Sequence, residues 1–90
     1  DVTFRAAPFD VAEAHRMIRE IRGFAMLEGV RGAPPSDIDA LAEMLSALSR
    51  FAAANADTVE SIDLNPVRVM DRGKGLVALD ALIVPVRREA

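Results

Sequence analysis

The sequence contains no cysteine, tryptophan or tyrosine, and only one histidine. The absence of cysteine excludes disulfides, thiolate metal sites and thiol nucleophiles, and it fits a cytoplasmic protein, which is the location we expect. No apolar run approaches the roughly 18 residues of a membrane-spanning helix, and the first residues do not have the basic and apolar regions of a signal peptide. We therefore expect no membrane partner.

Basic residues are too few and too scattered for a nucleic-acid surface. Eleven Lys and Arg stand against 14 Asp and Glu, the formal net charge is -3, and the pI is about 5.0. A nucleic-acid-binding face needs clustered positive charge, so we expect no nucleic-acid partner. The composition, 51% hydrophobic and 28% charged, is that of a globular chain. Its length predicts a single small domain over residues 1–90.

The first half of the chain predicts one strand and two helices. A half-buried strand is expected where apolar residues alternate with polar ones, at Val2, Phe4 and Ala6. A helix is expected over 10–22, because Asp10 precedes Glu13 by three residues as in a capping box, and apolar residues then recur at helical spacing. Residues 24–35 are rich in Gly and Pro and predict an ordered loop without regular structure, held to the core by Phe24, Met26 and Leu27.

The second helix carries the strongest periodic signal in the chain. Ser36 is the expected N-cap, Asp37 and Asp39 lie in the first turn, and Asn55 is the expected stop, which gives a helix over 36–54. Its apolar stripe consists of Ile38, Leu41, Leu45, Leu48 and Ala52.

Two strand-like runs, 59–70 and 76–84, flank the sequence D-R-G-K-G, which predicts a hairpin. The predicted fold class is therefore α+β, in the order β-α-α-β-β. We expect a three-stranded, mainly antiparallel sheet with two helices on one face.

Three oxygen-bearing side chains are predicted to converge on this hairpin. Asp63 and Asn65 alternate with apolar neighbours and so share a face, while Pro66 predicts a break in the strand. Asp80 is a lone carboxylate in an apolar run, where it needs a hydrogen bond, a counter-ion or a metal. If the turn is Asp71 to Lys74, Asn65 faces Asp80 with β-carbons roughly 5 Å apart.

Oxygen donors on neighbouring strands suit a hard cation such as Mg²⁺, whose remaining positions are filled by water and nucleotide phosphates. The alternative is structural: Asp80 is held by a helix or loop partner, and Asn65 with Pro66 only shapes a turn. Spacing alone does not choose between the two.

Four ordered stretches, covering nearly all of the chain, resemble the end of the ATP-grasp domain of NDP-forming acyl-CoA synthetases. They are D-V-T-F-R-A-A-P-F, L-E-G-V-R-G-A-P-P-S-D-I-D-A-L, E-S-I-D-L-N-P-V and G-L-V-A-L-D-A-L-I-V. The resemblance implies an excised part of a larger ligase, which forms acyl-CoA from a carboxylic acid, CoA and ATP and uses Mg²⁺. It also implies that the ligands of the metal are Asn65 and Asp80, with Asp63 as a further candidate. Many relatives have Glu where this chain has Ser61.

The same resemblance predicts the partners of the chain: the remainder of the ATP-grasp domain and the CoA-binding domains. We expect no catalytic residue within the chain, no activity of the chain alone, and self-association through apolar surface that those domains would cover. The rival hypothesis is a non-catalytic α+β scaffolding domain without nucleotide, in which Asp80 is satisfied by Arg or backbone donors.

Two further residues suggest chemistry. Arg31, in G-V-R-G, is a candidate contact to a nucleotide phosphate, and its alternative is an ion pair with Glu28, Asp37 or Asp39. His15 belongs to no catalytic motif, and we expect it to lie on the flank of the first helix.

Overall fold

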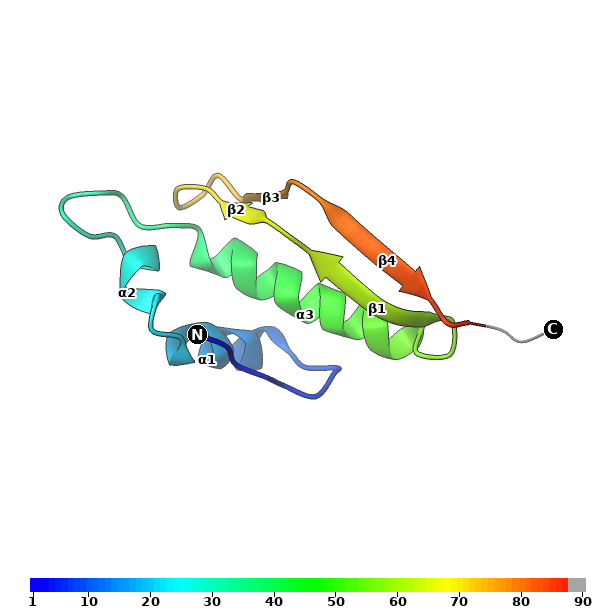
Figure 1. The fold of residues 1–90 in the computed structure, drawn as a ribbon. Helices are drawn as coiled ribbons and strands as arrows, with labels where there is room; N and C mark the ends of the chain where they lie inside the picture. Colours follow the sequence, from blue (N-terminus) through cyan, green and yellow to red (C-terminus); the bar gives the residue numbers. More distant parts are fainter. Residues whose placement is uncertain (88–90) are drawn as a thin grey trace.

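The computed structural model describes residues 1–87 and has helix α3 at its centre. Helix α1 packs on one side of α3, and a long antiparallel hairpin lies along the other side (Figure 1). No helix of the described residues is long and apolar enough to cross a membrane. The elements are α1 (Val11–Glu20), α2 (Phe24–Leu27), α3 (Ile38–Ala54), β1 (Val59–Leu64), β2 (Val67–Val69), β3 (Leu76–Ala78) and β4 (Ala81–Pro85).

The helix ends follow capping chemistry, with one correction. The Asp10 side chain accepts a hydrogen bond from the Glu13 amide at 2.8 Å, which confirms the predicted start of α1. In α3 the N-cap is Asp37 and not Ser36, because the Asp37 carboxylate accepts from the amide of Ala40 at 3.1 Å. Asn55 ends α3 as predicted.

The core is small and lies where α1 crosses α3. Ala14 and Ala42 are fully buried there, and Ile18 is 3% exposed. The two alanines let the helix backbones come close together, so a single larger side chain fills the contact between them. Larger apolar residues surround this centre and are only partly buried: Phe9, Phe24, Leu27, Ile38, Leu41 and Leu45.

The predicted loop after α1 contains one short helix, α2. Its sequence F-A-M-L has neither Gly nor Pro, and the Glu28 amide closes the turn by donating to the Phe24 carbonyl at 3.1 Å. Phe24 and Leu27 pack against the core as predicted. Met26 does not, since 71% of it is exposed.

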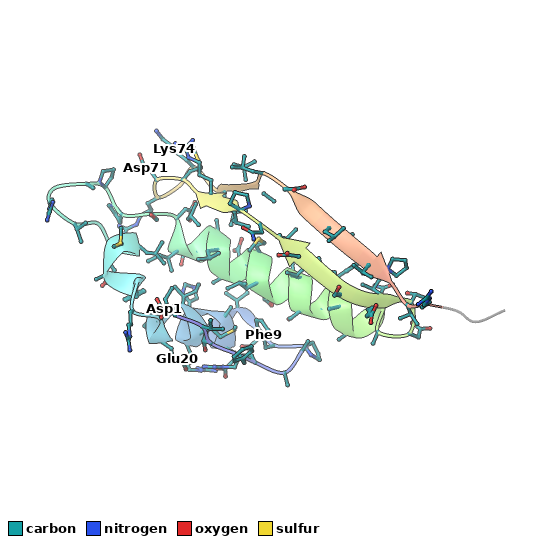
Figure 2. All side chains as sticks on the ribbon, in the orientation of Figure 1. Asp1, Phe9, Glu20, Asp71 and Lys74 are labelled. Carbon is teal, nitrogen blue, oxygen red and sulfur yellow. The ribbon has the colours of Figure 1, made fainter. Side chains whose placement is uncertain are left out.

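The strand predicted over residues 2–6 is absent, although the alternation behind it is real. Thr3 donates to the Glu20 carboxylate at 2.7 Å, and Arg5 donates to the Glu13 carboxylate at 2.8 Å. The segment is therefore tied to α1 by side chains, and its backbone pairs with no strand among residues 1–87. Its apolar side chains point the other way, so that Val2 is 73% and Phe4 82% exposed. Figure 2 shows Asp1 beside α1, where its carboxylate accepts from the amides of residues 22 and 23.

Acid is expected to weaken the attachment of this segment. Hydrogen bonds from Arg16 and then Arg5 lower the pKa of Glu13 to about 2. Because the folded pKa is depressed, the stabilisation is present above the unfolded pKa, near 4.5, and is lost as pH falls towards 2. In thermal melts from pH 7 to pH 2, Glu13→Gln should lower the thermal midpoint at pH 7 by a few degrees. Between pH 7 and pH 2 the midpoint of the variant should then decrease less than that of the parent.

The matched control for this prediction is Glu43→Gln, an exposed substitution on α3. Its melts should follow those of the parent at every pH. A Glu13→Gln variant with the acid dependence of the parent would show that the ion pairs of Glu13 do not stabilise the fold.

The hairpin differs from the predicted three-stranded sheet. Both of its arms are interrupted, so it consists of two two-stranded antiparallel sheets, β1 with β4 and β2 with β3. The interruption at residues 65–66 confirms the break predicted from Pro66, which has no amide hydrogen to donate. Only α3 packs closely against the strands, whereas α1 packs on α3, so the expectation of two helices on one face of the sheet is also wrong (Figure 1).

Self-association of the isolated chain is a prediction that the exposed side chains support. Four apolar residues of the β3–β4 arm are 44–61% exposed: Val77, Leu79, Leu82 and Ile83. Within the described residues, β4 pairs along one edge only. Sedimentation velocity over a wide concentration range should show dimers or larger species at the high end. A single monomer peak at every concentration would contradict this prediction.

Candidate functional site

The candidate site lies where both arms of the hairpin are interrupted. The Lys74 amide donates to the Asp71 carbonyl at 2.9 Å, which confirms the predicted turn. From this turn the register runs unchanged through Val67 opposite Ala78 to Leu64 opposite Ala81. It therefore places residue 65 opposite residue 80, as the sequence predicted.

The backbone ties the two candidate ligands together. The Asn65 amide donates to the Asp80 carbonyl at 3.1 Å, and the Leu79 amide donates to the Pro66 carbonyl at 2.9 Å. These two bonds hold the arms together at the point where neither is a regular strand. The side chains of Asn65 and Asp80 thus begin from one cross-strand position.

Asp80 is not in the environment that the sequence predicted. Its apolar neighbours suggested a buried strand, but Asp80 is exposed, and Leu79 and Leu82 are each 61% exposed. One carboxylate oxygen, Oδ1, accepts from the amide of Ala81 at 2.9 Å. Among the described residues, this is the only hydrogen bond that the Asp80 side chain makes. A backbone donor therefore fixes one oxygen, and the second can still accept.

Asp63 lies on the same exposed face as these residues. In β1 the half-buried Ile62 and Leu64 face α3, and Asp63 between them is exposed, as the alternation predicted. Its partner in the register is Leu82, which makes it a diagonal neighbour of Asp80. Such neighbours lie about 7–8 Å apart, within reach of a shared cation and its water ligands.

The donor types at this site fit a magnesium ion. They are one amide oxygen and one or two carboxylates, all of them hard oxygen donors. Within residues 1–87, no three His, Cys, Asp or Glu side chains form a cluster that could hold a metal ion. Magnesium commonly takes few protein ligands and completes its shell with phosphate and water, so Asn65 and Asp80 stay its candidate ligands.

Arg31 is exposed on the loop before α3, at a positive φ of 54°. Its alternative, an ion pair with Glu28, Asp37 or Asp39, is not present among residues 1–87. Asp37 accepts backbone amides, and Asp39 pairs with His15 at 3.3 Å. The pairing of His15 joins α1 to α3, which agrees with a residue on the flank of a helix. A phosphate contact of Arg31 stays a prediction.

Sequence reasoning missed the role of Asp37. It is 8% exposed, and its carboxylate accepts from the amides of Ala40, Gly73 and Gly75. These amides, those of Ala40 and Gly75 most strongly, lower the pKa of Asp37. The partners in the hairpin are 36 and 38 residues away along the chain, so no local pattern could have identified them.

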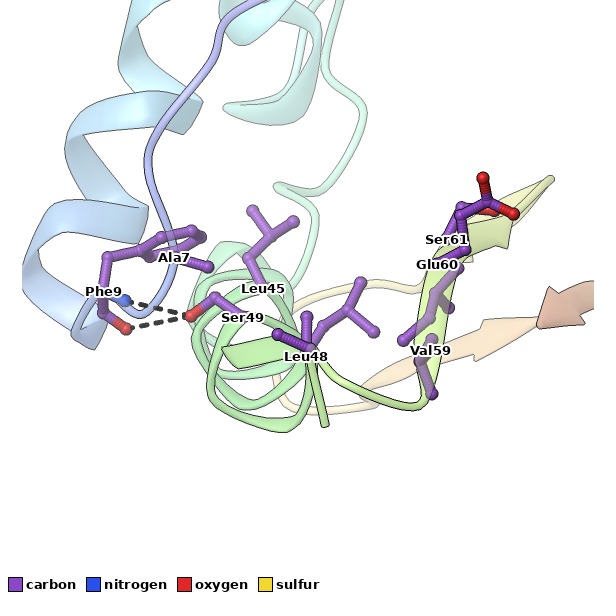
Figure 3. Close-up of a pocket in the computed structure, with 11 residues that line it drawn as sticks. Ala7, Phe9, Leu45, Leu48, Ser49, Val59, Glu60 and Ser61 are labelled. Carbon is purple, nitrogen blue, oxygen red and sulfur yellow. Dashed lines mark hydrogen bonds between the residues drawn. The ribbon is translucent and has the colours of Figure 1, made fainter. Parts of the chain in front are cut away.

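A separate apolar hollow of about 430 Å³ is lined by three parts of the chain: the segment that precedes α1, helix α3, and strand β1 (Figure 3). Phe9, Leu45, Leu48 and Val59 line it, and the Phe9 amide donates to the Ser49 hydroxyl at 3.1 Å. The Ser46 hydroxyl in turn donates to the Phe9 carbonyl at 2.8 Å. These bonds fix the segment before α1 onto α3, and they explain why two serines are buried in the helix.

Comparison with known proteins places this geometry in a family. The sequence pattern of the ATP-grasp domain matches residues 1–84. The chain belongs to the ATP-grasp family. This ATP-grasp chain is 42% identical over 84 residues to the beta subunit of acetate–CoA ligase (ADP-forming) II from Pyrococcus furiosus, a match that covers 93% of the chain and 36% of that subunit. It is 43% identical over 77 residues to acetate–CoA ligase (ADP-forming) I from Archaeoglobus fulgidus, where 86% of the chain and 11% of the relative are covered.

Solved structures agree with the sequence relatives. A crystal structure of a Pyrococcus horikoshii protein has a TM-score of 0.91 at 38% identity, over 98% of this ATP-grasp chain and 37% of that one. Acetyl-coenzyme A synthetase 1 of Ca. Korarchaeum cryptofilum, in complex with coenzyme A and Mg-AMPPCP, has a TM-score of 0.88 at 35% identity, over 96% and 39%. The ATP-grasp chain thus spans between 36% and 39% of the length of three of these relatives and 11% of the length of the fourth.

Proposed function

We propose that this ATP-grasp chain forms the magnesium–nucleotide corner of an NDP-forming acyl-CoA synthetase. The whole enzyme would convert a carboxylate, CoA and ATP into acyl-CoA, ADP and phosphate. The observation that carries the proposal is the shared interruption of the hairpin, with Asn65 opposite Asp80 and both side chains exposed. The ADP-forming acetate–CoA ligases among the relatives and the Mg-AMPPCP complex support it.

In this proposal Asn65 and Asp80 hold Mg²⁺, and Asp63 assists directly or through water. The metal would supply positive charge beside the phosphoryl group in transfer, a task of positioning and electrostatics. The amide of Ala81 binds Oδ1 of Asp80 and so restricts the carboxylate, whose second oxygen can bind the cation. The bond from Asn65 to the Asp80 carbonyl keeps the two ligands in register.

The chain would supply only part of the active site. The remaining groups would come from the rest of the ATP-grasp domain and from CoA-binding domains, and the relatives extend far enough beyond the matched region to contain further domains. Arg31 is an additional candidate for contact with a nucleotide phosphate. ATP and Mg²⁺ are therefore the expected cofactors of the full-length protein.

The test of the proposed reaction is a product analysis of the full-length protein. Incubated with ATP, Mg²⁺, CoA and short carboxylic acids, it should form acyl-CoA and release ADP and phosphate in equal amounts. The 90-residue chain alone, the matched control, should form none. Release of AMP and pyrophosphate, or acyl-CoA formation by the chain alone, would contradict the proposal.

A further inference from the structure

The Asp37 carboxylate joins two parts of the molecule that are far apart in sequence. Its Oδ1 accepts from Ala40 at 3.1 Å, which caps α3. Its Oδ2 accepts from Gly73 at 3.1 Å and from Gly75 at 2.8 Å, both in the turn between β2 and β3. One buried side chain therefore binds the start of the central helix and the tip of the hairpin together.

The backbone around Asp37 strengthens this attachment. The Asp37 amide donates to the Met70 carbonyl at 2.7 Å, and the Arg72 amide donates to the Pro35 carbonyl at 2.9 Å. Ser36 and Asp71 form an isolated antiparallel bridge. Figure 2 places Asp71 and Lys74 at this end of the hairpin, above the start of α3. The tip is thus fastened at several points, and among residues 1–87 the one buried side chain that takes part is that of Asp37.

Glycine allows the turn to present its amides to Asp37. Gly73 and Gly75 have φ values of 84° and 78°, in the left-handed region that other residues rarely adopt. This conformation aims both amides at one oxygen. Because the acceptor is a carboxylate, the two bonds are charge-assisted and stronger than bonds to a neutral group.

The attachment of the tip matters because the β2–β3 sheet is small. β2 and β3 have three residues each, and a two-stranded hairpin of this size is at best marginally stable without tertiary support. Val67 and Val69 are half-buried and give β2 some packing against α3. At the tip the support comes from Asp37 and the loop that precedes it.

The same register links the tip to the candidate metal ligands. It runs without a shift from the turn, through β2 and β3, to Asn65 and Asp80. A hairpin that moves on α3 therefore carries both ligands with it. We propose that Asp37 is a positioning residue, whose carboxylate fastens the β2–β3 turn to the start of α3 and thereby sets the place of Asn65 and Asp80.

This inference rests on the proposed function, and its test uses the full-length protein. Asp37→Ser keeps an oxygen suited to cap α3 but is too short to reach the turn, and Asp37→Asn keeps the length of the side chain without its charge. The control is Asp39→Asn, two residues further along in the first turn of the same helix, whose carboxylate is exposed and pairs with His15. Calorimetric titration of Mg²⁺ with a non-hydrolysable ATP analogue, well below the thermal midpoint, measures affinity in the folded state.

We expect Asp37→Ser and Asp37→Asn to weaken magnesium-dependent nucleotide affinity by about 2-fold to 30-fold, the size of effect that residues coupled to a site without touching its ligand can have. Hydrogen exchange at Gly73 and Gly75 should accelerate in both variants, and Asp39→Asn should bind as the parent does. A folded Asp37 variant with faster exchange but the affinity of the parent would overturn the proposal and leave Asp37 with a stabilising role only. Asp80→Ala is measured alongside: if it binds like the parent, the metal site itself is wrong.

Discussion

Asp80→Ala in the full-length protein is expected to lower kcat/KM for acyl-CoA formation by more than about 100-fold, the scale on which loss of a charge-stabilising group acts in such sites. The reason is that Asp80 supplies the one carboxylate placed opposite Asn65 by the hairpin register. Without it, the cation would rest on an amide oxygen and on the more distant Asp63. Steady-state kinetics at several Mg²⁺ concentrations measure the effect.

The control for this prediction is Asp57→Ala, an exposed carboxylate in the turn that precedes β1. It removes the same charge at the other end of the arm and should leave kcat/KM unchanged. Raising the Mg²⁺ concentration should restore part of the activity of Asp80→Ala, because the defect is weaker metal binding in a folded protein. An Asp80→Ala enzyme as active as the parent at every Mg²⁺ concentration would exclude Asp80 as a ligand.

Ile18→Ala is expected to reduce the free energy of unfolding of the chain by about 2–4 kcal/mol. Ile18 is 3% exposed and, within the described part of the chain, is the one large side chain in a buried centre otherwise made of Ala14 and Ala42. Its truncation leaves a cavity that the two helices cannot close by moving together, because Ala14 and Ala42 are already fully buried between them. For a domain of this size, the loss corresponds to a fall of roughly 10–25 °C in the thermal midpoint.

Chemical denaturation of the chain, followed by circular dichroism, measures this change. Val11→Ala is the matched control on the same helix, since Val11 is 38% exposed, and it should cost much less. Equal losses from the two substitutions would mean that the contact of α1 with α3 is not the core of the fold.

Elements whose cause is local could be predicted from the sequence. The apolar stripe and the stop at Asn55 predicted α3 to within two residues, and the error in its N-cap arose because Ser36 and Asp37 are both good caps. The hairpin register was predictable because turn length and strand alternation leave one pairing that agrees with both.

Elements that depend on distant partners could not be predicted in this way. The alternation of residues 2–6 shows that the segment has an apolar and a polar face. It does not show that the polar face binds α1 through Thr3 and Arg5, nor that the backbone pairs with no strand of the described residues. The β3–β4 arm is apolar in composition yet largely exposed, because α3 covers the hairpin from one side only. The apolar composition of this arm therefore suggested that Asp80 is buried, whereas in the structure it is exposed.

For the site, spacing predicted the opposition of Asn65 and Asp80 but not the ion that they would bind. That part of the prediction came from the resemblance to acyl-CoA synthetases. Asp37 shows the complementary limit, because two of the three amides that bind its side chain are 36 and 38 residues away along the chain. Local pattern gave it the role of a first-turn carboxylate, and tertiary structure adds the attachment of the hairpin.

The most direct test of the central claim is a calorimetric titration of Mg²⁺ and an ATP analogue into the full-length protein and into its Asn65→Ala and Asp80→Ala variants. The account predicts that both variants, folded by circular dichroism, lose the magnesium-dependent part of their nucleotide affinity. Unchanged affinity in both would contradict it and would make Asn65 and Asp80 structural residues of the hairpin.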